Sequence, residues 1–175
     1  STDVGPVIDG AALQELQAHA EKMEKEFSLI AKAPMGADLS GHYMAPCAFE
    51  IDSINTLKEE VFGPVLHVVR YRARDLDRII DEINGTGYGL TLGIHSRIDR
   101  TQRHIAKRVL AGNCYINRNM IGAVVGVQPF GGERLSGTGP KAGGPHYMFR
   151  FATERTLTVN TAAVGGNALL LELDD

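Results

Sequence analysis

Residues 59–65 read Glu-Glu-Val-Phe-Gly-Pro-Val and place an acidic and an aromatic side chain directly before a Gly-Pro turn. Glu60 and Phe62 are two positions apart, so in an extended backbone both side chains face the same side. An ionised carboxylate can accept hydrogen bonds from both hydroxyls of a sugar diol. On spacing alone a second interpretation stands beside this one, in which the glutamates are solvated turn charges and Phe62 packs in the core.

A second candidate site lies in a glycine-rich stretch further along the chain. It contains Gly122 and Ala123 and continues into the run Gln-Pro-Phe-Gly-Gly at residues 128–132. Adjacent backbone N–H groups on a turn of small residues form a concave site for an anion, and Phe130 offers an aromatic wall beside it. A plain glycine turn with a buried Phe is the alternative that these residues leave open.

Composition bounds the function classes. The chain has 175 residues, 43% of them hydrophobic and 22% charged, which is enough for one ordinary domain with a real core. Its net charge of −3 gives no reason to expect a nucleic-acid partner. The longest apolar pattern is interrupted by charges, so no membrane span is expected. The chain has two cysteines, too few for a disulfide framework, and six histidines without metal-ligand spacing, so neither a disulfide framework nor a metal site is expected. The low cysteine content predicts a cytoplasmic location.

Hydrophobic periodicity predicts an α/β fold. Asp9 is a plausible N-cap of a first helix whose apolar residues recur at spacings of three and four as far as Ile30, with Pro34 and Gly36 as its end. Alternating strand and helix patterns then follow at residues 43–51, 65–71, 76–83, 90–95, 99–109 and 113–117. Such an order is typical of βαβ units, so the expected core is a parallel sheet.

The last third of the chain is less regular. Residues 122–144 show almost no periodicity and predict a long loop, which in a compact protein is usually functional or disordered. Residues 149–159 alternate well enough to predict a strand, and the remaining residues are interpreted as a tail.

The two candidate sites together resemble the aldehyde dehydrogenase family. Glu-x-Phe-Gly-Pro before an apolar strand is similar to the segment whose glutamate holds the nicotinamide ribose in that family, which implies that Glu60 and Phe62 bind NAD. Pro-Phe-Gly-Gly after a variable loop is similar to the segment that lines the aldehyde pocket. The loop here resembles the glutamate-semialdehyde (pyrroline-5-carboxylate) dehydrogenase branch. That implies that Gly122 and Ala123 bind the substrate α-carboxylate and that Phe130 flanks its aliphatic part.

The glycine-rich run at 132–145 and the run at 154–161 resemble the dehydrogenase module of proline utilization A, and the similarity extends from Val4 to Leu170. The resemblance implies L-glutamate γ-semialdehyde as the substrate, an oxidoreductase role in proline catabolism, and a homo-oligomer assembled through a late strand. It also implies three parts: residues 1–147 as the C-terminal part of an aldehyde dehydrogenase catalytic domain, residues 148–163 as an oligomerisation strand, and residues 164–175 as a tail.

No catalytic residue is expected in this chain. Aldehyde oxidation in this family needs a cysteine thiolate, an oxyanion site and a general base. Cys47 and Cys114 both lie in strand-like runs without a glycine turn or an adjacent base, and are expected to be buried packing thiols. In the family these groups precede the segment that begins here at Val4, so the chain is expected to be an inactive fragment on its own. Two alternatives to this function remain: a fragment of an aldehyde dehydrogenase with another substrate, and a non-catalytic interaction module on the same fold.

Overall fold

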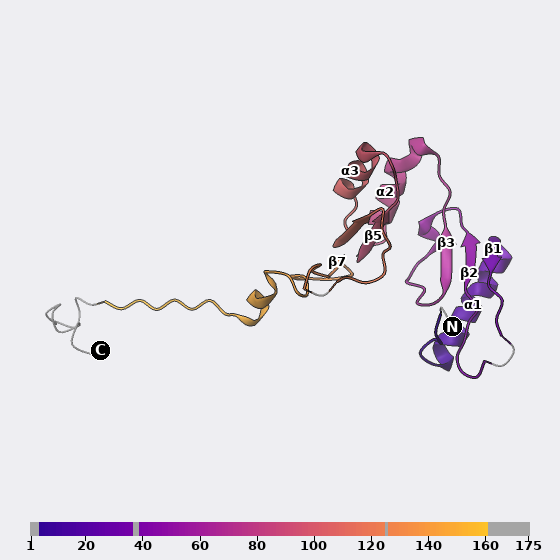
Figure 1. Cartoon of the computed structure of the whole chain (residues 1–175), viewed down its shortest axis with the longest axis horizontal. Coiled ribbons are helices and arrows are strands. Elements are labelled where there is room, and N and C mark those ends of the chain that lie inside the picture. Colours follow the sequence, from indigo (N-terminus) through magenta and orange to yellow (C-terminus); the bar gives the residue numbers. More distant parts are fainter. Residues whose placement is uncertain (1–3, 37–38, 125, 161–175) are drawn as a thin grey trace.

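The computed structural model describes residues 4–36, 39–124 and 126–160. Figure 1 shows two groups of elements followed by a long arm. The first group holds α1 (Gly10–Glu26), β1 (Ser28–Lys32), β2 (Cys47–Glu50), the short 3-10 helix η1 (Ile54–Thr56) and β3 (Val65–Val68). The second holds η2 (Ala73–Asp75), α2 (Leu76–Gly85), β4 (Tyr88–Gly89), β5 (Thr91–Ile94), α3 (Asp99–Arg108), β6 (Asn113–Ile116) and β7 (Glu133–Arg134). The predicted α/β class is confirmed.

α1 begins where the sequence predicts and ends earlier. The Asp9 carboxylate accepts a hydrogen bond of 2.8 Å from the backbone N–H of Ala12, as a helix N-cap does. The expected continuation to Ile30 is wrong, because the backbone is already extended at Phe27. Residues 28–32 form β1 instead and pair antiparallel with β2. A strand partner far along the chain therefore decides the conformation of a segment whose local pattern also suits a helix.

The first sheet has the order β1-β2-β3, with β2 and β3 parallel. β2 is thus the central strand, and it starts directly after Pro46, where the ladder needs no N–H from the proline. Its inward residues Cys47 and Phe49 pack against Met23 of α1, and Phe49 is completely buried. α1 and this sheet form the main described core of the molecule.

In the second group β5 and β6 are parallel, with α3 as the crossover between them, so this part is a βαβ unit as expected. The sequence predicts one continuous parallel sheet, but the strands lie in separate sheets: β3 pairs with β2 in the first group, and β5 pairs with β6 in the second. α2 lies beside α3, and an ion-pair cluster joins the two helices: Asp77 contacts His104 and Arg108 at 2.6 and 2.5 Å, and Asp81 contacts Arg108 at 3.0 Å. The hydroxyl of Ser53 donates to Glu82 of α2 at 3.0 Å and links the two groups.

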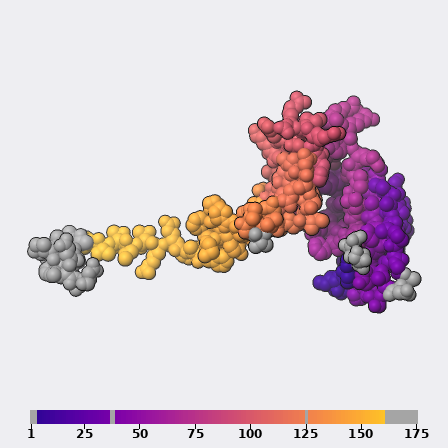
Figure 2. Space-filling view, in the orientation of Figure 1, coloured from indigo at the N-terminus to yellow at the C-terminus, as the bar shows by residue number. Residues whose placement is uncertain are grey.

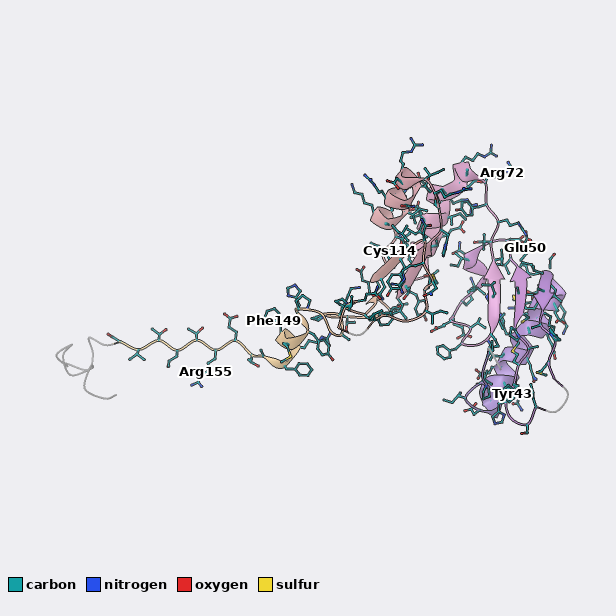
Figure 3. All side chains as sticks on the ribbon, viewed as in Figure 1. Tyr43, Glu50, Arg72, Cys114, Phe149 and Arg155 are labelled. Atoms are coloured by element: carbon teal, nitrogen blue, oxygen red, sulfur yellow. The ribbon has the colours of Figure 1, made fainter. Side chains whose placement is uncertain are left out.

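The arm begins with the 3-10 helix η3 (Tyr147–Phe151) and continues as extended chain to residue 160 (Figure 2). The strand expected at residues 149–159 is therefore wrong in this structure over its first three residues, and the rest pairs with no strand in the described part of the chain. Figure 3 shows Arg155 on this arm, well away from the β1-β2-β3 sheet and from the β5-β6 sheet. A strand needs a partner for its backbone groups, and here the described chain supplies none. Residues 161–175, which include the predicted tail, lie outside the described residues.

Within the described ranges, every helix is too short or too polar to cross a bilayer. The same residues contain no group of three or more His, Cys, Asp and Glu side chains arranged to hold a metal ion.

Candidate functional site

The turn before β3 presents Glu60 and Phe62 to solvent. Gly63 donates its N–H to the carbonyl of Val61 at 3.0 Å and accepts from Val65 at 2.8 Å, so the chain reverses tightly at this point. A Cβ on Gly63 would lie 2.4 Å from Cδ1 of Leu16, so the turn packs closely against α1 at this glycine. Both candidate side chains are exposed, and Phe62 is 84% exposed. The alternative in which Phe62 packs in the core is excluded within this chain.

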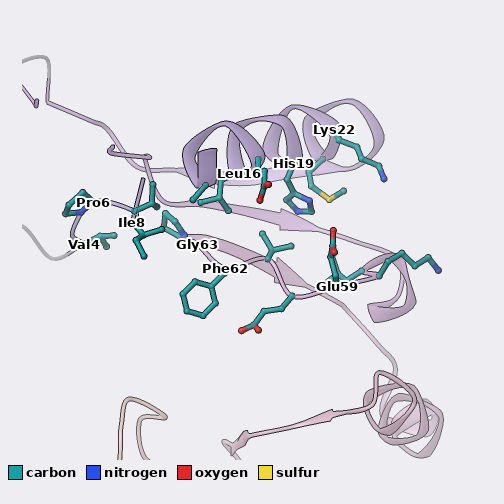
Figure 4. Close-up of a pocket in the computed structure, with 18 of the residues that line it drawn as sticks. Val4, Pro6, Ile8, Leu16, His19, Lys22, Glu59, Phe62 and Gly63 are labelled. Carbon is teal, nitrogen blue, oxygen red and sulfur yellow. The ribbon is translucent and has the colours of Figure 1, made fainter. Parts of the chain in front are cut away.

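An open cleft of about 1000 Å³ runs between α1 and this turn. Its lining includes Leu16, His19 and Lys22 from α1, together with residues 59–64. Figure 4 shows Glu59 on the α1 side of the turn and the Phe62 ring on the side away from the helix. Glu59 and Glu60 both line the next cleft as well, which is described below.

A second cleft of about 530 Å³ lies between the Glu60 turn and the second group of elements. It is lined by Glu60 on one side and by Tyr88, Leu135 and Ser136 on the other. The N–H of Gly89 donates to the Ser136 hydroxyl at 3.0 Å, which holds β4 against the second half of the loop at residues 122–144. The structure therefore brings Glu60 close to residues 135 and 136 of this loop.

The first half of that loop is attached to the C-terminal end of β6. Asn117 adopts a left-handed backbone conformation with φ of 54°, and its side-chain amide exchanges hydrogen bonds of 3.0 and 2.9 Å with the backbone of Ser96. Gly122 also has a positive φ of 62° and is exposed. Among the described residues, the N–H groups of Gly122 and Ala123 have no hydrogen-bond acceptor. Both N–H groups are therefore available to an anion, and the binding of a carboxylate at these two positions stays a prediction.

The second half of the loop returns to the N-terminal end of β6. Phe130 is half-buried and exchanges two backbone hydrogen bonds with Ala142, of 3.0 and 2.9 Å. Next to it, Gly131 and Gly112 make a close backbone contact, since a Cβ on Gly112 would lie 2.0 Å from the Gly131 carbonyl oxygen. Gly122, Ala123 and Phe130 thus share one loop, but none of them lines either cleft that contains Glu60.

Neither cysteine has the environment of an activated nucleophile. Cys47 is buried, as predicted, and burial raises the pKa of its thiol. Cys114 on β6 is exposed, so its predicted burial is wrong. Among the described residues β6 pairs with β5 alone, and its position as an edge strand leaves this side chain accessible. Partial burial raises the pKa of the Cys114 thiol as well, although the residue is exposed overall. A raised pKa keeps a thiol protonated and unreactive.

Two arrangements beside these sites have no signal in the sequence. His19 of α1 and His67 of β3 face each other across 48 positions, and each lines one of the two clefts. The buried Asn113 at the start of β6 contacts Lys141 and the carbonyl of Gly131. The residues in each arrangement are too far apart in the sequence for a periodic pattern to reveal that they are in contact.

Comparison with known proteins supplies the chemical context. The aldehyde dehydrogenase family model matches residues 1–157. The bifunctional protein PutA of Rhizobium meliloti is 48% identical over 173 residues, which are 98% of this chain and 14% of the relative. A 1-pyrroline-5-carboxylate dehydrogenase from a Geobacillus species is 38% identical over 160 residues, which are 90% of this chain and 30% of the relative.

Solved structures give the same assignment. A mutant of proline utilization A (PutA) from Bradyrhizobium japonicum superposes with a TM-score of 0.85 and 60% identity, covering 93% of this chain and 16% of the other. A 1-pyrroline-5-carboxylate dehydrogenase from Thermus with bound NAD superposes with a TM-score of 0.74 and 35% identity, covering 85% of this chain and 29% of the other. The 175 residues thus span less than a third of the length of each of these relatives.

Proposed function

We propose that this chain, which belongs to the aldehyde dehydrogenase family, is part of the catalytic domain of an NAD-dependent dehydrogenase that oxidises L-glutamate γ-semialdehyde to glutamate in proline catabolism. The relatives reported above carry the names PutA and 1-pyrroline-5-carboxylate dehydrogenase. The boundaries proposed from the sequence are retained, with residues 1–147 in the catalytic domain, residues 148–163 in an oligomerisation segment and residues 164–175 as a tail.

The observation that carries the proposal is the pair of backbone N–H groups at Gly122 and Ala123, which have no acceptor among the described residues. A substrate with an α-carboxylate needs donors that lie close together without a bulky side chain, and this turn offers both. Gly122 has no described atom within 4 Å of the place where a Cβ would lie, so the approach to these N–H groups is open. Phe130 would flank the aliphatic part of the aldehyde, since it belongs to the same loop.

Glu60 and Phe62 fit the ribose of a nicotinamide cofactor. Glu60 is an exposed carboxylate lining both clefts, and it can accept from two adjacent hydroxyls. Phe62 offers an open aromatic face directly beside it. NAD, when bound, supplies the hydride acceptor for aldehyde oxidation. The residues of this chain would hold and orient the cofactor, not react with it.

The nucleophile is proposed to come from another part of a longer dehydrogenase. Both thiols of this chain have raised pKa values, which argues against either as the attacking thiolate. The complete enzyme is proposed to work as a homo-oligomer, with the extended residues 152–160 pairing with a second subunit. Leu157 and Val159 are largely exposed on this arm and would be covered there. The enzyme is proposed to work in the cytoplasm, because both cysteines of this chain are free thiols and the cytoplasm keeps thiols reduced.

The test is a chimera in which residues 4–160 replace the matching segment of the Rhizobium meliloti PutA, at 48% overall identity. The chimera is expected to form NADH with glutamate semialdehyde, whereas the purified 175-residue chain is expected to form none. A chimera that folds and binds NAD but oxidises only a simple aliphatic aldehyde would point to another substrate. One that folds and oxidises no aldehyde would favour a non-catalytic module.

A further inference from the structure

The loop that carries Phe130 is fastened to β6 by a lysine. The Gly131 carbonyl oxygen accepts from Nζ of Lys141 at 3.1 Å and from Nδ2 of Asn113 at 3.2 Å, and Oδ1 of Asn113 accepts from the same Nζ at 3.4 Å. We propose that Lys141, acting through Asn113 and Gly131, is a positioning residue that sets the place of Phe130 in the substrate pocket. The proposal rests on the function proposed above.

The contact between Lys141 and Asn113 matters for stability because Asn113 is buried. Asn113 is only 5% exposed, and its amide also donates to the carbonyl of Leu90 at 2.8 Å. Its side-chain oxygen has Lys141 as its hydrogen-bond donor. Removing the ammonium group would leave a buried amide oxygen without that donor, which costs more than the loss of an exposed contact. In the described ranges Lys141 forms no ion pair, so these neutral oxygens are what hold its charge in place.

The position of Lys141 is transmitted to Phe130 through the backbone. Ala142 follows Lys141 and forms both of the hydrogen bonds that hold Phe130. Gly131 follows Phe130, and a Cβ on it would lie 3.3 Å from Cα of Lys141, so the two segments are closely packed. A shift of Lys141 must therefore move Phe130 as well. The predicted cofactor residue Glu60 is in a separate turn and is not part of this network.

The first test measures amide hydrogen exchange in the full chain. In Lys141→Met, which removes the charge, the amides of Phe130 and Ala142 are expected to exchange about tenfold faster, because their segment loses charge-assisted hydrogen bonds. Lys141→Arg should restore most of the protection. The amide of the core residue Phe49 reports that the fold is intact, and Lys107→Met on the exposed face of α3 is the matched control. Unchanged exchange at both loop amides in a folded Lys141→Met would overturn the proposal.

The second test measures kinetics in the PutA chimera. Lys141→Met is expected to raise the KM for glutamate semialdehyde roughly tenfold, with less than a twofold change in the KM for NAD, since a misplaced pocket wall weakens substrate positioning. Lys141→Arg should recover most of this loss. Equal changes in both KM values would indicate a general structural role and contradict the proposal. A chimera that is inactive with the unaltered loop refutes the proposed function instead, while the exchange experiment still decides the role of Lys141.

Discussion

The Nε2 atoms of His19 and His67 lie 2.9 Å apart, with the two imidazole rings in an edge-to-face arrangement. His19 is on α1 and His67 is on β3, so this contact joins the first helix to the sheet. One ring nitrogen must donate and the other must accept, which requires at least one of the rings to be neutral. Burial lowers the pKa of both residues, with Lys22 adding to the effect on His19 and His19 adding to the effect on His67.

Acidification should therefore destabilise the fold through this pair. A histidine with a lowered pKa in the folded state binds its proton more readily when unfolded, so its contribution is complete above the ordinary value of about 6.5. It is lost as the pH falls from there towards the lowered pKa. The midpoint of urea denaturation, measured between pH 7.5 and 5, is expected to fall more steeply for the unaltered chain than for His67→Gln. The exposed His95→Gln is the control and should keep the steep slope.

The contact between Gly112 and Gly131 predicts a stability difference between two glycines. In Gly112→Ala the new methyl group would meet the Gly131 carbonyl oxygen at 2.0 Å, a backbone atom that cannot move aside cheaply. We expect a loss of about 1–3 kcal/mol in the free energy of unfolding, the usual range for overpacking. Gly85→Ala, in the last turn of α2, meets no described atom within 4 Å and should leave stability unchanged or raise it by up to about 1 kcal/mol. Equal effects in urea titrations would refute the steric argument.

Glu60→Gln tests the proposed ribose contact. An amide has one acceptor oxygen where the carboxylate has two, and it carries no charge, so the KM for NAD in the chimera is expected to rise about tenfold. Glu59→Gln is a matched control from the neighbouring position, on the α1 side of the turn, and should change this KM less than twofold (Figure 4). The KM for NAD of each variant is measured by steady-state kinetics with saturating aldehyde. A larger effect at Glu59 would transfer the proposed role to that residue.

Ala123→Leu tests the proposed anion site. The larger side chain is expected to obstruct the N–H groups at positions 122 and 123, lowering kcat/KM for glutamate semialdehyde roughly 10- to 100-fold, as for the loss of a charge-assisted hydrogen bond. A simple aliphatic aldehyde lacks the α-carboxylate, so its kcat/KM should fall far less. Ala123→Ser, which keeps the side chain small, provides the comparison. If both aldehydes lose the same factor, the turn does not discriminate for a carboxylate.

Local chemistry explains what could be predicted of the candidate site. The Gly-Pro turn after Phe62 limits the backbone within a few residues, so the turn itself follows from the residue types, whereas the exposure of the Phe62 ring does not. The same holds for Gly122, whose positive φ is a conformation that glycine adopts easily. The opposite is true of Lys141, since its hydrogen bonds to Asn113 and Gly131 depend on how a long loop returns to β6.

The sequence by itself determined the α/β class, the cap at Asp9 and the helices α2 and α3, because these follow from periodicity and local hydrogen bonding. It also determined the parallel pairing of β5 with β6, because a strand-helix-strand order favours a parallel crossover. Only the tertiary structure decided that residues 28–32 become a strand, that Cys114 is exposed, and that His19 meets His67. These outcomes depend on contacts between residues that are far apart in the chain. Their free energies appear only when the elements pack, and there they outweigh local preferences of a few tenths of a kcal/mol per residue.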